Sequence, residues 1–151
     1  MKYASFGSIS TGTLRTADLL ASFAAELSHH VKANFDNLEP KAIYDYAATI
    51  GAAECNESIA EHDPDHADDI LTDLQEALQH FAPPYAYFGA LEGDGADFGF
   101  WPSIDAVKEY CTQISDPADV ENHLGEECFY VNDHGNVTVY AADGSVIWDC
   151  V

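Results

Sequence analysis

Residues 54–76 read ECNESIAEHDPDHADDILTDLQE, and the organisation of the chain can be worked out from this stretch. It contains no lysine or arginine, and neither residue occurs between Lys41 and Lys108 or after Lys108. Its second half repeats apolar residues at helical spacing, which predicts a helix with one face on a core and the other in solvent. The stretch therefore predicts a strongly acidic surface on a folded protein. Its nine carboxylates are Glu54, Glu57, Glu61, Asp63, Asp65, Asp68, Asp69, Asp73 and Glu76.

The second half of this stretch predicts a helix over residues 66–81, with Pro64 breaking the chain before it and Asp65 as the N-cap. Like charges three or four residues apart repel by a few tenths of a kcal/mol per pair, and no lysine is interleaved to relieve them. An ordinary solvated helix would interleave lysines. The apolar face consists of Ile70, Leu71, Leu74, Ala77, Leu78 and Phe81, and the opposite face carries Asp65, Asp69, Asp73 and Glu76.

Outward from the acidic stretch, the pattern predicts helices first and strands afterwards. Helices are expected over 17–30 and from Pro40 to Ile50, with a continuation over 52–61 that places Glu54, Glu57 and Glu61 on one face. Apolar alternation and turn residues after Pro83-Pro84 predict the remaining elements. These are strands over 85–91, 97–101, 128–131, 137–141 and 146–150, a helix over 104–111 and a helical turn over 120–124. The sequence therefore predicts a single α+β domain over 1–151, with N-terminal helices packed on a C-terminal antiparallel sheet of hairpins.

Charge is the most unusual property of the composition. The 151 residues carry a formal net charge of −22, while 47% hydrophobic and 12% aromatic residues are typical of a folded chain. A charge of this size opposes the compact state, so we expect a cationic partner, bound cations or a saline medium to compensate it. Nucleic acid and anionic membranes are excluded as direct partners because both are polyanions.

Motifs for metal binding or catalysis are absent. His62 and His66 lie four residues apart, but Pro64 between them argues against one continuous helical face. The stretch Glu92–Asp97 has oxygen ligands that calcium accepts, yet it lacks the EF-hand pattern and a hairpin turn explains it. No nucleophile elbow or phosphate-binding loop is present. We predict no enzyme, no catalytic residue, no metal and no cofactor.

Cysteine usage and the N-terminus indicate the compartment. The cysteines are dispersed, and the chain shows neither a signal-peptide pattern nor an apolar run long enough to span a membrane. We therefore expect reduced thiols and a location in the cytoplasm of the host cell.

Two further stretches carry a resemblance. GDGADFGFWPS at 93–103 and NDHGNV at 132–137 resemble small uncharacterised proteins of bacteriophages and other mobile elements. This resemblance covers the C-terminal half and implies no activity and no catalytic residue. In size and acidity the chain is also similar to DNA-mimic inhibitors of restriction and CRISPR systems, a similarity of charge without a shared motif.

Together these features predict an acidic anti-defence protein that mimics nucleic acid and occupies the basic groove of a host nucleic-acid-binding protein. Two alternatives stay open: an accessory domain whose acidity reflects a saline host, and an enzyme with a pocket holding a perturbed cysteine, histidine or carboxylate. The oligomeric state is left open. The expected partner-binding residues are Glu54, Glu57, Glu61, Asp65, Asp68, Asp69, Asp73 and Glu76.

Overall fold

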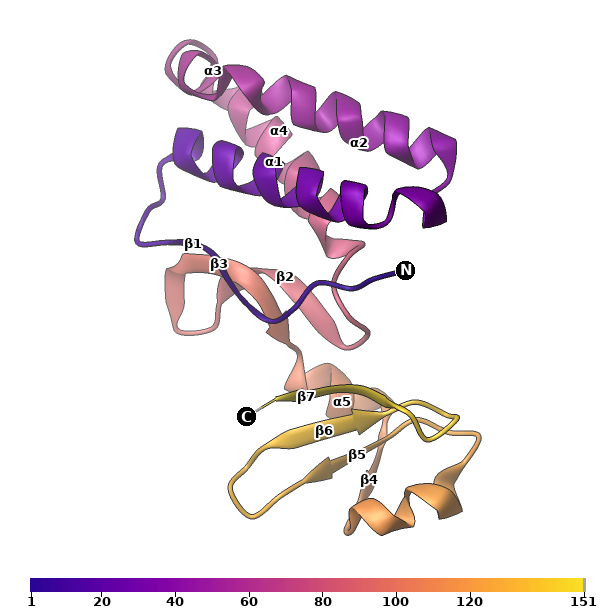
Figure 1. Ribbon diagram of the computed structural model, residues 1–151. Coiled ribbons are helices and arrows are strands. Elements are labelled where there is room, and N and C mark those ends of the chain that lie inside the picture. Colours follow the sequence, from indigo (N-terminus) through magenta and orange to yellow (C-terminus); the bar gives the residue numbers. More distant parts are fainter. Residues whose placement is uncertain (151) are drawn as a thin grey trace. The chain divides into compact units, whose positions relative to one another are not determined.

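The computed structural model describes residues 1–150, apart from the side chains of residues 55–57 (Figure 1). The chain divides into two compact units, one formed by Met1–Ala82 and Tyr87–Trp101 and the other by Pro83–Ala86 and Pro102–Val151. The first unit holds β1 (Gly7–Thr11), α1 (Thr16–Ala33), η1 (Phe35–Asn37), α2 (Pro40–Ala52), η2 (Ala53–Cys55), α3 (Asn56–His62), α4 (Pro64–Gln79), β2 (Ala86–Leu91) and β3 (Asp94–Pro102), where η denotes a 3-10 helix. The second holds α5 (Ile104–Tyr110), β4 (Thr112–Ile114), η3 (Pro117–His123), β5 (Cys128–Val131), β6 (Val137–Tyr140) and β7 (Val146–Cys150).

The predicted α+β class is confirmed, with helices dominating the N-terminal part and strands the C-terminal part. The expected antiparallel sheet of hairpins needs correction in its detail. There are two sheets, ordered β1-β3-β2 and β4-β5-β6-β7, and the second is mixed because β4 pairs parallel with β5. The prediction of one domain over 1–151 stays a prediction.

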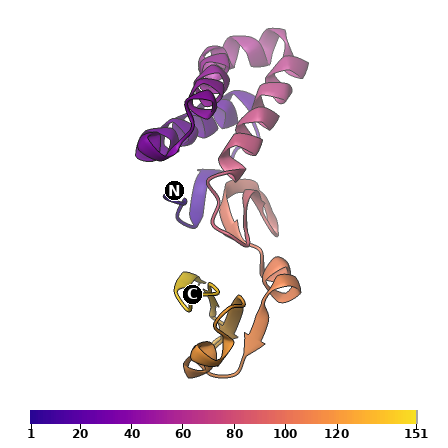
Figure 2. The same cartoon turned by 90° about the vertical axis from the view of Figure 1, so that its right-hand side faces the viewer.

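In the first unit, α1 lies between α2 and the sheet β1-β3-β2 (Figure 1). Phe23 of α1 is fully buried, and its ring lies edge-on to Phe88 of β2 with 4.9 Å between centroids. Phe100 of β3 is also fully buried and lies 4.9 Å from Phe88. Figure 2 shows α4 running from the α3 end of the helical layer to this sheet. The aromatic core therefore joins the helices to the sheet within this unit.

The start of α4 differs from the prediction. Asp63, not Asp65, is the N-cap: its Oδ1 accepts a hydrogen bond from His66 N at 3.3 Å. Pro64 does not exclude the helix but occupies its first turn, where the missing N–H costs nothing. Asp65 lies in that same turn, exposed, where its charge complements the helix dipole.

Replacing each of these two aspartates is expected to change the free energy of unfolding by a different amount. We expect Asp63→Ala to lower the free energy of unfolding by about 1 kcal/mol, because the cap bond is lost. Asp65→Ala is the matched control and should cost only a few tenths of a kcal/mol, since only the interaction with the dipole is lost. Urea unfolding of both variants measures the difference, and an equal loss would contradict the assignment of Asp63 as the cap.

One face of the mixed sheet in the second unit is buried along three neighbouring strands. Phe129 of β5 is paired with Val139 of β6, which is paired with Trp148 of β7, so the three buried side chains share a face. Val107 of α5 is fully buried in this unit, and Ser103 caps that helix by accepting from Ala106 N at 3.4 Å. The strands predicted at 128–131 and 146–150 are confirmed, while the three-residue β4 was not predicted.

Candidate functional site

The solvent side of α4 carries a continuous row of carboxylates. The helix buries its opposite face, through Ala67, Ile70, Leu74, Ala77 and Leu78. At about 100° per residue, the row falls within an arc of about 140° centred opposite that buried face. We call this row the α4 acidic face; its exposed members are Asp65, Asp68, Asp69, Asp73 and Glu76.

The spacing of these charges is close to that of a nucleic-acid strand. Asp65 and Glu76 are eleven residues apart, or about 16 Å along the axis at 1.5 Å per residue. Five carboxylates over that length give about one negative charge per 4 Å. One strand of duplex DNA carries one phosphate per about 3.4 Å of axis. The α4 acidic face therefore has nearly the linear charge density of one strand.

None of these carboxylates takes part in an ion pair among the described residues. The ion pairs that are described join Arg15 to Asp18, His30 to Glu26, Lys41 to Asp45 and His123 to Glu126. A surface without internal counterions keeps its full attraction for external cations. The α4 acidic face is thus available to a cationic partner.

The second predicted acidic face, made of Glu54, Glu57 and Glu61, is not a single helical face. Glu54 lies in η2, whereas Glu57 and Glu61 belong to α3, so the change of helix type breaks the expected i, i+3, i+7 register. Glu54 and Glu61 are exposed, and the side chain of Glu57 lies outside the described residues. Glu61 lines a cavity of about 340 Å³ together with Arg15, so this glutamate has a cation nearby. The α4 acidic face is the more uniform anionic surface.

The two histidines flanking Pro64 belong to different helices. His62 ends α3, and its Nδ1 contacts Ser58 O at 2.9 Å, whereas His66 lies in the first turn of α4. Across the described part of the chain, no group of three or more histidine, cysteine, aspartate or glutamate side chains is placed to hold a metal ion. None of the described helices has the length and hydrophobicity needed to span a bilayer.

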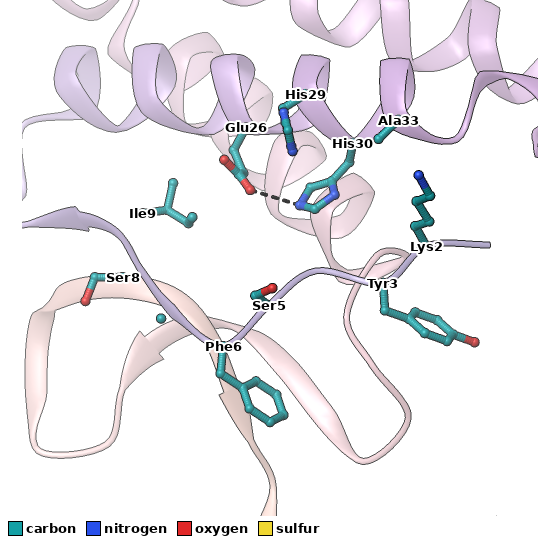
Figure 3. A pocket seen from close by; sticks show the side chains of 11 residues that line it. Lys2, Tyr3, Ser5, Phe6, Ser8, Ile9, Glu26, His29, His30 and Ala33 are labelled. Atoms are coloured by element: carbon teal, nitrogen blue, oxygen red, sulfur yellow. Dashed lines mark ion pairs between the residues drawn. The ribbon is translucent and has the colours of Figure 1, made fainter. Parts of the chain in front are cut away.

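A cavity of about 380 Å³ lies between α1 and the N-terminal segment, a feature that the sequence did not reveal (Figure 3). Glu26, His29 and His30 reach it from α1, and Lys2 and Ser5 line it from the N-terminal segment. We call it the N-terminal cavity. The i, i+4 spacing of Glu26 and His30 on one helix was the signal that could have indicated this pair.

The N-terminal segment is held over α1 by backbone hydrogen bonds. Asn34, fully buried, donates from Nδ2 to Lys2 O at 3.0 Å and accepts from Lys2 N at 2.5 Å. Ala4 N donates to Phe81 O at 2.8 Å. Because these bonds fix the segment at two points, the cavity is part of the folded unit.

His30 is a core residue, although the helix predicted over 17–30 placed it at a helix end. The helix continues past it to Ala33, and the imidazole is 6% exposed, stacked on Phe81 at 5.2 Å. Its buried Nε2 lies 2.9 Å from Glu26 Oε1, so the imidazole is paired with that carboxylate. Burial lowers the pKa of His30, and His29 lowers it further, against the opposing effect of Glu26. His30 is therefore neutral at pH 7.

The lowered pKa of His30 predicts how the stability of the fold depends on pH. The unfolded state binds a proton at His30 below about pH 6.5, while the folded state binds it only at lower pH, so stability falls as the solution is acidified through that interval. The slope from one such proton is at most about 1.4 kcal/mol per pH unit. Urea unfolding between pH 7.5 and 5.5 should show this loss in the wild type and in the exposed-site control His134→Gln, but a smaller loss in His30→Phe. An unchanged slope in His30→Phe would contradict the assignment.

A second polar cluster, in the second unit, is structural. Tyr85 is the one non-glycine residue with positive φ (61°) in the described chain, a strained conformation for an aromatic residue. Its Oη donates to Glu127 Oε2, and its carbonyl accepts from Ser103 N at 2.8 Å. The bond to Glu127 raises the pKa of Tyr85, and burial raises the pKa of the Cys111 thiol. Neither group is an activated nucleophile at pH 7.

Comparisons with protein-family models, curated proteins and solved structures found no match to this chain. Two features of the first unit have the chemistry to bind another molecule. The α4 acidic face offers a row of unpaired charges to a large cationic surface, and the N-terminal cavity offers a small, partly open volume lined by a carboxylate and by His30.

Proposed function

We propose that the protein is a non-enzymatic inhibitor that mimics nucleic acid and occupies the basic groove of a host nucleic-acid-binding protein through the α4 acidic face. The proposal includes its biological setting: a phage or mobile-element protein that acts in the host cytoplasm against a restriction or CRISPR-type defence protein. The observation that carries the proposal is the linear charge density of Asp65, Asp68, Asp69, Asp73 and Glu76, which no described cation neutralises.

The physical argument depends on what a nucleic-acid groove recognises. Such a groove places lysine and arginine side chains against phosphates, and this contact is independent of base sequence. A rigid helix with carboxylates at similar spacing presents the same charges without bases. Because its opposite face is fixed to a core by Ile70 and Leu74, the helix binds without a large ordering cost.

The first experiment is a pull-down of tagged protein from nuclease-treated host lysate, at about 0.05 M and about 0.5 M salt, read by mass spectrometry. Exposed charge pairs are screened at the higher salt, where the Debye length falls well below 10 Å. We expect one nucleic-acid-binding protein to be retained at low salt and lost at high salt.

A column that retains no cationic protein at either salt would contradict the proposal and favour a saline adaptation of the surface. That alternative has its own signature, measured on the purified protein. Its free energy of unfolding should rise steeply with salt, because salt screens the self-repulsion of a chain with a net charge of −22.

A further inference from the structure

We propose that a second copy of this chain covers the groove between α1 and α2, so that the protein forms a two-fold symmetric dimer. Two adjoining hollows of about 340 Å³ and about 250 Å³ form this groove. We call it the α1-α2 groove; its central lining is Ala21, Ala25 and Ser28 of α1 and Ala47, Ile50 and Gly51 of α2. No residue of α4, which is described throughout, lines this groove, so the inference stands independently of the proposed function.

The first step is the apolar surface that α2 leaves uncovered. None of the thirteen residues of α2, all of which the structure describes, is buried. Ile43 and Ile50 are seven residues apart, hence on one face of the helix, and both line the groove while only half-buried. A helix in a protein takes most of its stability from the packing of such a face. A partner seated in the groove completes that packing.

The second step is the shape of the groove. On α1 it is lined by small side chains at steps of four and three, Ala21, Ala25 and Ser28. On α2, Ala47 and Gly51 lie four residues apart. Small side chains let the backbone of another helix come close, because the distance between packed helices depends on the side chains at the contact. Between residues 21 and 32 of α1 the groove runs about 16 Å, which accommodates about three turns of a helix.

The third step is the charge of the groove, which points to a second copy as its occupant. In a chain with a net charge of −22, the groove is lined by one cation, Lys32, and one carboxylate, Glu54. Two such chains repel through their acidic surfaces, so they meet most favourably where each is neutral. A salt concentration of 0.15 M, with a Debye length of about 8 Å, screens the charges on the other faces.

The fourth step is the position of those two charges. α1 and α2 run side by side in opposite directions, so Lys32 lies toward one end of the groove and Glu54 toward the other (Figure 1). Neither takes part in an ion pair among the described residues. A two-fold axis that crosses the groove between them brings Lys32 of each copy to Glu54 of the other. The groove thus has the self-complementary charges that a two-fold interface requires.

The test is sedimentation velocity of the full-length protein at about 0.15 M salt, from about 1 µM to about 200 µM, a range that spans a micromolar dissociation constant. We expect the monomer to give way to a species of twice its mass. Ala47→Glu, which puts a charge in the middle of the groove, should raise the dissociation constant of the dimer about 100-fold or more. Ala48→Glu is the matched control, since Ala48 is an exposed residue of α2 that does not line the groove. It should change that constant less than about threefold.

An exchange of charges tests the predicted pairing. Lys32→Glu and Glu54→Lys should each weaken the dimer about tenfold or more, because both create like-charge contacts. The double variant Lys32→Glu/Glu54→Lys restores opposite charges at both contacts, so its affinity should return to within about threefold of the wild type. The single variants change the net charge in opposite directions, which separates pairing from general repulsion between acidic copies.

Four results would overturn the proposal. The first is a wild type that stays monomeric up to about 200 µM, which leaves the groove to a different protein. The second is equal weakening by Ala47→Glu and Ala48→Glu. The third is a double charge variant that dimerises no better than the single ones. The fourth is opposite effects of Lys32→Glu and Glu54→Lys, because general charge repulsion then governs the association.

Discussion

Charge reversal of Asp69 and Asp73 to lysine should abolish capture of the basic partner while leaving the fold intact. Each replacement exchanges the attraction between a phosphate-like charge and the basic groove for repulsion between two positive charges. Interfacial charge pairs of this kind are worth several kcal/mol, so we expect the affinity to fall at least about 100-fold. The measurement is the dissociation constant for the captured partner at low salt.

The stability of this variant is expected to move in the opposite direction. Lysine at 69 lies four residues after Asp65, and lysine at 73 lies three residues before Glu76, so repulsive pairs on the helix become attractive ones. The free energy of unfolding should therefore stay constant or rise by a few tenths of a kcal/mol. Loss of binding with unchanged stability separates the role of the surface from any effect on folding.

A double variant in the second unit provides the control. The side chains of Glu109 and Asp133 are exposed. Their replacement by lysine changes the net charge by the same amount as the α4 variant. Equal weakening by both variants would show that net charge alone governs binding, and the α4 acidic face would then lose its special role.

The second large effect is a loss of stability, which we expect on substitution of Gly99 in the sheet of the first unit. A Cβ atom at this position would lie 2.1 Å from Gly7 O, 2.8 Å from Gly7 C and 3.0 Å from Ser8 Cα. All three atoms belong to the backbone of β1, which pairs with β3 through Ser8 and Gly99, so no side-chain rotation relieves the clash. Gly99→Ala should lower the free energy of unfolding by about 3 kcal/mol or more.

Gly95→Ala is its matched control in the same strand. A Cβ at Gly95 meets no atom within 4 Å, and its backbone is not in the left-handed region. We expect a change of no more than about 0.5 kcal/mol. Thermal unfolding should then show a melting temperature about 6 °C or more lower for Gly99→Ala than for Gly95→Ala. Equal melting temperatures would contradict the close approach of β1 and β3.

Periodicity was enough to predict the elements whose stability is local. The apolar face of α4 predicted its core contacts, and the alternation at 128–131 and 146–150 predicted two strands of the second sheet. What periodicity did not predict depends on partners distant in the sequence. β4 has only three residues and exists because Thr112–Ile114 pairs in parallel with β5.

The candidate site was predictable to a similar extent. Exposure of the α4 carboxylates followed from their position opposite the apolar face. The absence of a lysine among them is visible in the sequence itself. The N-terminal cavity did not follow, because its walls come from α1 and a segment that is fixed by Asn34 and Phe81. The burial of His30 depends on those same tertiary contacts, so a helix-end histidine was the simpler expectation from sequence.

The most direct test of nucleic-acid mimicry is competition on the captured partner. A labelled 20-base-pair duplex is first bound to that partner, and the protein is then added while duplex release is followed by fluorescence anisotropy. Our account predicts complete displacement by the wild type, and no displacement by Asp69→Lys/Asp73→Lys at the same concentration. A ternary complex in which duplex and protein bind the partner together would contradict it.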